Sequence, residues 1–439
     1  MQDPEQPSGA GLRLGALCVA LLSLGWGLWL AARPLTAFGI AALTVLWLLR
    51  RWPRLAAAGV RCERRMGQAA LEDEELPVEF RLENHTWLPL FCPQVEDRFA
   101  PDKQPRRQAW VWPVLPPWSA ASARYQGRCY SRRGTFAIGP ATVRLTCPVG
   151  LFQAAVEPGP PAALVVYPAL EALPELAAGG ASRAAHLGGA ARREAGEGDV
   201  VHGVRDHRAG DPLRRVHWPT TARRGRLAIL ELERHVAREV VLFLDLSPGS
   251  MRGLGRQSTL EVAVRAVGSV AARLLAQGAR VGLLGAGAQP VRVAPGRGPL
   301  QLTRILEVLA RVKPDGALSL PELVSSAGDE VPPGGGAWVV VNDPELDGEA
   351  LLAPLLAMRA RRAEVTLVLL DPATFRRLHP LPGNGPPTGL EELAQRFSAH
   401  GLRVHVLRAG EPFGPALGAP WAGRPRIRVH RRAAPEGAA

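Results

Sequence analysis

The sequence predicts a membrane-anchored α/β protein. A doubly wound, mainly parallel sheet follows an antiparallel β-sandwich-like domain and an N-terminal transmembrane helical hairpin. Three observations lead to this fold class: two uncharged stretches near the N-terminus, short alternating strands over 76–168, and apolar strands alternating with helical segments over 239–409. These patterns divide the chain into six parts, which are residues 1–54, 55–170, 171–200, 201–238, 239–410 and 411–439.

Residues 12–32 and 34–52 form the predicted hairpin. No residue from Leu14 to Ala32 is charged, and a helix of this length reaches about 29 Å, close to the hydrocarbon thickness of a bilayer. Arg33-Pro34 ends the run, and flanking tryptophans and arginines extend the next uncharged stretch. A secretory signal peptide is the alternative for the first stretch, but a second apolar stretch follows at once without a good cleavage site.

Charge around the hairpin predicts its orientation. Arginines crowd the far side of the second stretch, at positions 50, 51, 54, 61, 64 and 65. By the positive-inside rule this side is cytoplasmic, so the protein is expected to be a multi-pass protein of the cell (inner) membrane with its soluble domains in the cytoplasm. The five cysteines show no metal-ligand spacing and are expected to be reduced and mostly buried; they are Cys18, Cys62, Cys92, Cys129 and Cys147.

The net charge of +13 comes almost entirely from arginine, since Lys103 and Lys313 are the only lysines. Ala, Gly, Pro and Arg are all abundant, which is typical of compositional bias in the coding DNA. No nucleic-acid-binding motif accompanies the charge, so membrane lipid rather than nucleic acid is the expected partner. The sequence also contains neither a P-loop motif nor a G-x-S-x-G nucleophile motif.

The middle of the chain is predicted to be β-rich. Residues 78–84 alternate apolar and polar side chains, and residues 132–152 read as a hairpin with a Gly-Pro turn. The alternation predicts a small antiparallel sandwich, from which no chemistry can be derived. Residues 171–200 are rich in Ala, Gly and Glu and predict a flexible connection.

Residues 239–410 predict the doubly wound sheet. Strands are expected at 240–244, 280–286, 337–343, 364–371 and 403–407. Helices are expected at 259–277, 299–312, 349–362 and 388–400, and the first carries a single solvent-facing polar stripe that includes Glu261, Ser269 and Gln277. The tail from residue 411 is basic and predicted to be solvated.

An arginine-rich segment, RDHRAGDPLRRVHWPTTARRGR at 205–226, precedes the first of these strands. It resembles the hallmark of the family called domain of unknown function 58 (DUF58), R-E-Y-x-x-G-D-x-x-R-x-I-x-W-x-x-[ST]-A-R. The matching positions are Arg205, Gly210, Asp211, Arg214 or Arg215, Val216, Trp218, Thr221, Ala222 and Arg223. The resemblance also covers the Gly-Pro turn upstream, although Cys147 and Val149 replace the family's usual residues, and it implies a von Willebrand factor A-like α/β domain.

Three interpretations of the hallmark stay open. As a structural clasp, Asp211 would pair with Arg205 or Arg223 while Trp218 packs beneath. As a binding surface, exposed arginines would contact acidic groups on a partner or on anionic lipid. As a catalytic site it would use His202, His207 or His217, although no acid–base–nucleophile spacing accompanies them.

Candidate metal ligands lie where the apolar strands end. Asp245, Ser247 and Ser250 follow the first strand, and Asp343 ends the strand expected at 337–343. Oxygen ligands at this edge suit Mg²⁺. Compared with the metal-ion-dependent adhesion site of von Willebrand A domains, Ser250 stands one place late and the loop 286–300 has no Thr. At most weak Mg²⁺ binding is expected.

Two functions follow as hypotheses. The first is a non-enzymatic adaptor or scaffold that binds other proteins. The resemblance implies a MoxR-type AAA+ ATPase and a transglutaminase-like membrane protein as its partners. The alternative is a metal-assisted hydrolase that uses Asp245 and Asp343. An enzyme requires a closed concave site where these carboxylates meet the hallmark arginines, whereas an adaptor requires an open face at the strand ends.

Overall fold

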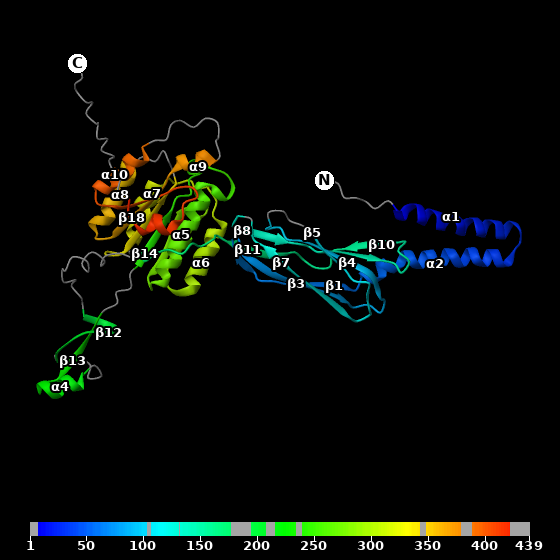
Figure 1. The fold of residues 1–439 in the computed structure, drawn as a ribbon, viewed down its shortest axis with the longest axis horizontal. Helices are drawn as coiled ribbons and strands as arrows, with labels where there is room; N and C mark the ends of the chain where they lie inside the picture. Colours follow the sequence, from blue (N-terminus) through cyan, green and yellow to red (C-terminus); the bar gives the residue numbers. More distant parts are fainter. Residues whose placement is uncertain are drawn as a thin grey trace, which may run out of the picture. The chain divides into compact units, whose positions relative to one another are not determined.

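The computed structural model describes residues 8–102, 107–130, 132–176, 195–207, 216–233, 239–342, 348–378 and 389–421. The chain divides into two compact units, Met1–Tyr167 and Pro168–Ala439. Figure 1 follows the chain by colour, from the blue helices of the first unit to the red end of the second.

Two apolar helices open the first unit. α1 spans Ser8–Trp29 and α2 spans Arg33–Ala57, and each is long and apolar enough to cross a membrane. Ala31, with a positive φ of 48°, turns the chain between them. Pro34 lies in the first turn of α2, where a missing N–H costs no helical hydrogen bond. The two predicted helices are confirmed, and α2 continues past residue 52 to Ala57.

Short strands fill the rest of this unit, as predicted. They are β1 (Val60–Arg65), β2 (Ala69–Leu71), β3 (Glu75–Asn84), β4 (Leu90–Arg98), β5 (Arg107–Val111), β6 (Val114–Leu115), β7 (Ala120–Arg128), β8 (Gly134–Ile138), β9 (Thr142–Thr146), β10 (Gln153–Val156) and β11 (Ala162–Tyr167). They pair as β1-β3-β7, as β10-β9-β4-β5 with β6 beside β4, and as β2-β11-β8. Among the described strands of this unit, only β2 and β11 pair in parallel. Phe80, Val95, Val143 and Leu164 bring the three sheets into one core.

The predicted hairpin at 132–152 is wrong. β8 and β9 flank the Gly139-Pro140 turn, but β8 pairs with β11 and β9 pairs with β4 and β10. The turn therefore carries the chain from one sheet to another. Alternation predicts strands and their faces but not their partners, because several strands of similar length compete for each edge.

The second unit contains a six-stranded sheet in the order β16-β15-β14-β17-β18-β19. The strands are β14 (Glu239–Leu244), β15 (Arg280–Ala286), β16 (Pro290–Gly296), β17 (Gly336–Val341), β18 (Glu364–Leu370) and β19 (Arg403–Leu407). All neighbours are parallel except β15 and β16. The five predicted strands are confirmed, whereas the antiparallel edge strand β16 was not predicted. Its sequence is rich in Gly and Pro, which interrupt the alternation of apolar and polar residues that predicts a strand.

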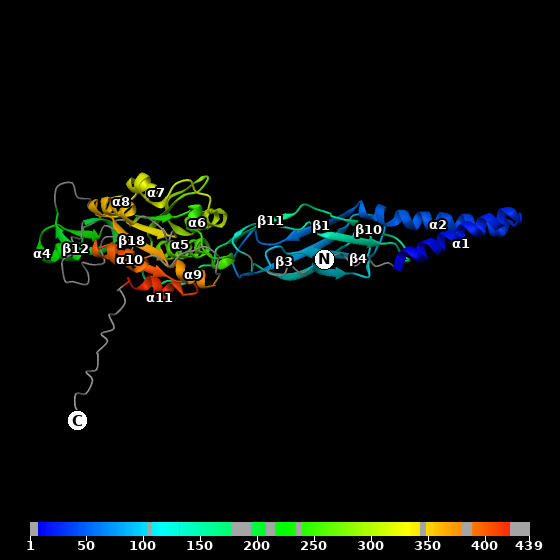
Figure 2. The ribbon, with the colours of Figure 1, turned by 90° about the horizontal axis from the view of Figure 1, so that it is seen from above.

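Helices cover both faces of this sheet (Figures 1 and 2). They are α5 (Thr259–Ala276), α6 (Gly298–Arg311), α7 (Leu320–Ala327), α8 (Gly348–Ala360), α9 (Pro372–Leu378), α10 (Leu390–Ala399) and α11 (Phe413–Gly418). α7, α8 and α10 share one core with alternate residues of the strands, such as Val339 and Leu367. The intervening residues point the other way, since successive strand side chains alternate between faces. Among these, Trp338 stacks on His405, whose ring contacts the carbonyl of Ala416 in α11.

The polar stripe of α5 does not face solvent as predicted. Ser269 accepts a hydrogen bond from the backbone N–H of Glu171, at 2.9 Å. Arg273 and Gln277 donate to the carbonyls of Pro174 and Leu176, at 2.9 and 3.3 Å. The stripe therefore holds the first residues of the segment predicted to be a flexible connection. The sequence pattern of a polar helix face is the same whether its side chains form hydrogen bonds with water or with the backbone of another segment.

β12 (Ala195–Asp206) and β13 (Ala228–Glu233) form a separate antiparallel pair joined by α4 (Trp218–Arg224). β12 begins inside the stretch 171–200, where no strand was expected. The pairing shifts register at Val201, and such irregular pairing removes the period-2 pattern from the sequence.

All five cysteines are free. Cys129 and Cys147 are buried and Cys62 is half-buried, but Cys18 and Cys92 are exposed, so the prediction that most are buried holds only in part. Burial raises the pKa of the Cys62 thiol to about 11, so this thiol stays protonated and unreactive.

Candidate functional site at the carboxyl edge of the sheet

Asp245 lies at the point where the order of the strands reverses. β14 leads along the chain to β15 on one side and has β17 on the other, so a crevice is expected beyond the carboxyl ends of β14 and β17. Asp245 directly follows β14 and is only 2% exposed. Its Oδ1 accepts hydrogen bonds from the backbone N–H of Ser247 at 2.9 Å and from the Ser247 hydroxyl at 2.7 Å. The carboxylate thus orders the turn that follows β14.

Asn342 joins the two central strands at this edge. It follows β17, is 1% exposed, and its Nδ2 donates to the carbonyl oxygen of Asp245 at 3.0 Å. Its Oδ1 is buried and has no hydrogen-bond partner among the described residues. Asn342 was not among the predicted site residues, which included the next residue, Asp343, instead. The signal was present, since a polar side chain that ends a fully apolar strand needs a partner.

The loop from 313 to 319 lies against the same turn. The backbone N–H of Gly316 donates to the carbonyl of Leu246 at 2.9 Å, and the backbone N–H of Ala288 donates to Asp315 at 3.0 Å. These bonds bring the segments after β14, after β15 and before α7 together. The edge is therefore built from three loops that are distant in sequence.

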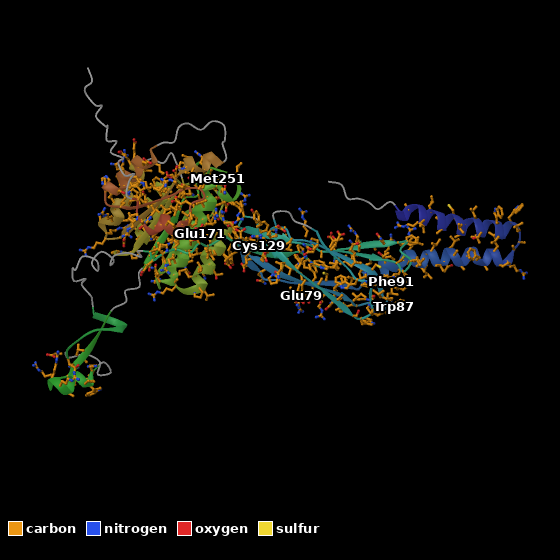
Figure 3. The ribbon with its side chains drawn as sticks, viewed as in Figure 1. Glu79, Trp87, Phe91, Cys129, Glu171 and Met251 are labelled. Atoms are coloured by element: carbon orange, nitrogen blue, oxygen red, sulfur yellow. The ribbon has the colours of Figure 1, made fainter. Side chains whose placement is uncertain are left out.

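Exposed apolar side chains lie on two of these loops. Met251 and Leu254 follow Asp245 and are 43% and 56% exposed, and Leu318 follows Gly316 and is 47% exposed. Figure 3 labels Met251 on the surface of this unit. We call these three residues the apolar rim. Large apolar side chains held in water on ordered loops are typical of surfaces that bind proteins.

The hallmark segment is described in part. Gly210, Asp211, Arg214 and Arg215 lie outside the described residues, as does the side chain of Arg205. Thr221 in α4 accepts a hydrogen bond from the backbone N–H of Ala228 at 3.0 Å, and His217 contacts the hydroxyl of Thr220 at 2.8 Å. These bonds fix α4 on β13.

Trp218 and Arg223 point into solvent. Trp218 is 67% exposed, and the hallmark loop beneath which the clasp hypothesis places this ring lies outside the described residues. No residue of α4 is itself buried, and the indole lies on the solvent side of this helix. Arg223, Arg224 and Arg226 are exposed as well, and Arg226 lies 3.7 Å from Asp206.

Comparison with known families now identifies this segment. Residues 203–383 match the model of the family described as protein of unknown function DUF58. This part of the chain is a DUF58 region. The DUF58 match begins in β12 and ends after α9, so it contains α4, Asp245, Asn342 and the apolar rim.

No curated protein matches the chain. Solved structures that it matches include the CARDB domain of a Pyrococcus furiosus protein, at 10% identity over 25% of this chain and 94% of that one, with a TM-score of 0.18. The alkylpurine DNA glycosylase AlkC of Pseudomonas fluorescens gives 13% identity, 34% and 41% coverage and a TM-score of 0.15. The GH20 exo-β-N-acetylglucosaminidase of Vibrio harveyi gives 10% identity, 80% and 82% coverage and a TM-score of 0.16. Likenesses at these TM-scores carry no information about the fold or function of this chain.

The predicted metal ligands of the DUF58 segment are brought together only in part. Asp245 and Ser247 are adjacent, whereas Asp343 and the side chain of Ser250 lie outside the described residues. Asn342 adds an amide oxygen to the same corner. Carboxylate, hydroxyl and amide oxygens are ligands that Mg²⁺ accepts, so the donor types fit. Among the described residues, no three His, Cys, Asp or Glu side chains gather as a metal site.

We expect Mg²⁺ to bind the full-length protein with an apparent Kd no tighter than roughly 1 mM, worth about 4 kcal/mol. The reason is that Ser250 stands one place late and the loop 286–300 has no Thr, so two of the oxygen ligands of the metal-ion-dependent adhesion site are missing, whereas Mg²⁺ demands a nearly ideal octahedron. Isothermal titration calorimetry in detergent with Mg²⁺ and Mn²⁺ measures the affinity. Micromolar binding that disappears in Asp245→Ala would contradict this prediction.

A cavity of about 320 Å³ lies beyond the carboxyl ends of β18 and β19, lined in part by Glu171, Arg265, Phe375, Arg408 and Glu411. Arg408 lies 3.6 Å from Asp371, and Glu171 accepts a hydrogen bond from the backbone of Phe413 at 2.8 Å. The described lining includes neither Asp245 nor a hallmark arginine. The cavity is therefore not the closed site at which the hydrolase hypothesis places these groups.

Proposed function

We propose that this protein is a membrane-anchored adaptor whose α/β domain is von Willebrand A-like and binds another protein through its carboxyl edge. The order of the six strands, the antiparallel edge strand β16 and the buried aspartate after the first strand all support the von Willebrand A-like assignment. The apolar rim is the observation that carries the proposal.

The rim suits a protein partner better than a small molecule. Met251, Leu254 and Leu318 project from the surface rather than into an enclosed cavity, and each exposes more than 40% of its area. The loops beneath them are ordered by Asp245, Ser247 and Gly316. An apolar surface that is already ordered loses little conformational entropy when a partner covers it.

The anchor is the helical hairpin α1–α2. We propose that both helices cross the cell (inner) membrane and that the arginines after α2 hold the soluble units in the cytoplasm. We further propose that the partner is a MoxR-type AAA+ ATPase, working beside a transglutaminase-like membrane protein. This last step rests on the family resemblance of the hallmark segment.

Binding to a purified MoxR-type ATPase tests the proposal. The full-length protein in nanodiscs would be immobilised, and its affinity for the ATPase would be measured by biolayer interferometry with and without ATP. We expect the double variant Met251→Glu/Leu254→Glu to lose at least about tenfold in affinity, or 1.4 kcal/mol, because charges replace the apolar contact area.

Leu300→Glu is the matched control. Leu300 is 75% exposed but lies at the start of α6, directly after β16, which runs antiparallel and therefore ends at the opposite edge of the sheet. This variant should bind as the wild type does. Equal losses in the two variants, or binding that neither changes, would show that the partner uses another surface.

The hydrolase that uses Asp245 and Asp343 is the weaker alternative. A carboxylate that activates water or holds a substrate-bound metal must be reached from solvent, and Asp245 is 2% exposed with Oδ1 bonded twice to Ser247.

A further inference from the structure

Three loops of the first unit carry exposed apolar side chains at one end of its β-strands. Trp87 in the loop 85–89 is 74% exposed, Trp118 in the loop 116–119 is 70% exposed, and Val149 in the loop 147–152 is 60% exposed. Trp118 also has a positive φ of 56°, a conformation that is costly for a bulky residue. We call these three residues the tryptophan face.

Strand pairing brings the three loops together. Leu90 at the start of β4 pairs with Leu115 in β6, and Phe91 pairs with Thr146 at the end of β9. Asn84, which is 1% exposed, donates to the carbonyl of Leu88 at 2.8 Å and to that of Pro116 at 2.9 Å. The two tryptophan loops are thus fixed to each other by a buried amide.

The hairpin helix α2 contacts these loops at its arginine-rich end. Trp52 in α2 packs on Phe91, with ring centroids 5.9 Å apart. Just after α2, the carbonyl of Gly59 accepts a hydrogen bond from His85 at 2.9 Å. Figure 3 places the labels of Trp87 and Phe91 where α2 enters the β-rich part.

The other helix makes a similar contact. The side chain of Arg13 in α1 donates to the carbonyl of Leu151, and its guanidinium lies 5.5 Å from the ring centre of Phe152. Both ends of the hairpin that would leave the membrane on this side therefore touch the loops of the tryptophan face.

The geometry of α2 sets the depth of these contacts. Leu49 is the last apolar residue before Arg50-Arg51, and Trp52 lies three residues further, about 4.5 Å along a helix axis. The interfacial layer on each side of the hydrocarbon is roughly 5 to 8 Å thick. The contact between Trp52 and Phe91 then falls within this layer, and the neighbouring loops reach it too.

We infer that the tryptophan face lies in the interfacial layer of the bilayer that holds the hairpin, so that the β-rich part rests on the membrane. Tryptophan prefers this layer because its ring is apolar and its indole N–H can bond to headgroups and water. Exposed arginines nearby, at positions 50, 51, 54 and 61, would face anionic lipid headgroups. The inference rests on the proposed membrane hairpin and adds a second, peripheral contact to it.

Quenching of tryptophan fluorescence by lipid tests this inference. The full-length protein would be placed in nanodiscs of phosphatidylcholine and phosphatidylglycerol, with or without bromine on the acyl chains near the headgroups. The signal of interest is the wild-type fluorescence minus that of Trp87→Phe/Trp118→Phe. We expect brominated lipid to remove most of this difference signal and acrylamide in the water to remove little of it.

Trp218→Phe supplies the matched control, because Trp218 is 67% exposed and belongs to the second unit. Its difference signal should be quenched by acrylamide and not by brominated lipid. A tryptophan face that behaves like Trp218 would overturn the inference and leave these side chains free for a protein partner. If the hairpin itself did not cross the bilayer, brominated lipid would also fail to quench Trp26, Trp29 and Trp47, which distinguishes the two failures. Unchanged circular dichroism of both variants shows that they fold.

Discussion

Replacing Asp97 with alanine is expected to destabilise the β-rich part of the first unit by about 3 to 5 kcal/mol, because it leaves a buried charge unpaired. The Asp97 side chain is 0% exposed and lies 2.6 Å from the guanidinium of Arg64, which is itself 7% exposed. Tyr125 donates its hydroxyl to the other carboxylate oxygen, also at 2.6 Å. Arg64 cannot turn to water, since it also donates to Ile138 and lies over the ring of Phe80.

Urea unfolding of the full-length protein in detergent, followed by circular dichroism, measures this loss. Glu79→Ala is the matched control, because Glu79 pairs with Arg124 at 2.9 Å on the surface, where the Arg124 side chain is 80% exposed. Such a pair contributes at most about 1 kcal/mol. If the free energy of unfolding fell by a similar amount in the two variants, burial of the Arg64–Asp97 pair would have no effect on stability.

Replacing Gly316 with alanine is expected to cost about 3 kcal/mol in the second unit, at the upper end of the range for overpacked sites. A Cβ at this position would lie 1.9 Å from the carbonyl oxygen of Ala286, so the loop must move. Moving it also breaks the hydrogen bond from Gly316 to Leu246. Leu318 would then leave the apolar rim, and affinity for the proposed partner should fall together with stability.

Thermal unfolding and the interferometry assay measure the two effects. Gly249→Ala is the control, since it lies on the neighbouring loop after Asp245 and a Cβ there meets no atom within 4 Å. This variant should match the wild type in both assays. A Gly316→Ala protein with unchanged melting temperature would show that the loop is free to shift.

The Arg64–Asp97–Tyr125 network illustrates what sequence patterns leave open. The three residues lie on β1, β4 and β7, and each stands in a strand where polar residues alternate with apolar ones. Alternation places Asp97 in phase with the buried Val95 and Phe99, but it does not indicate which strands supply the partners of this carboxylate. How deeply these side chains are buried depends on which sheet covers that face. Burial also raises the pKa of the Tyr125 hydroxyl, which therefore stays protonated and donates to Asp97.

The residues of the candidate site also divide into those that local patterns predict and those that depend on tertiary contacts. Asp245 and Ser247 could be predicted because an aspartate that ends a fully apolar strand is a local pattern. Gly316 and Leu318 could not, because their roles depend on a loop about 70 residues further along the chain meeting the turn after β14, as the bond from Gly316 to Leu246 shows. The hallmark motif is also local, and it was enough to predict the DUF58 family.

The sequence by itself determined the two apolar helices, the positions of five strands of the α/β sheet and the family of residues 203–383. These depend on hydrophobic period, on the absence of charge and on short motifs, which are properties of neighbouring residues. Only the tertiary structure decided that β8 and β9 belong to different sheets, that the polar stripe of α5 holds residues 171–176, and that Trp218 is exposed while Asp97 is buried. Those outcomes depend on contacts between segments that are distant in the sequence. A local pattern does not indicate how stable such contacts are.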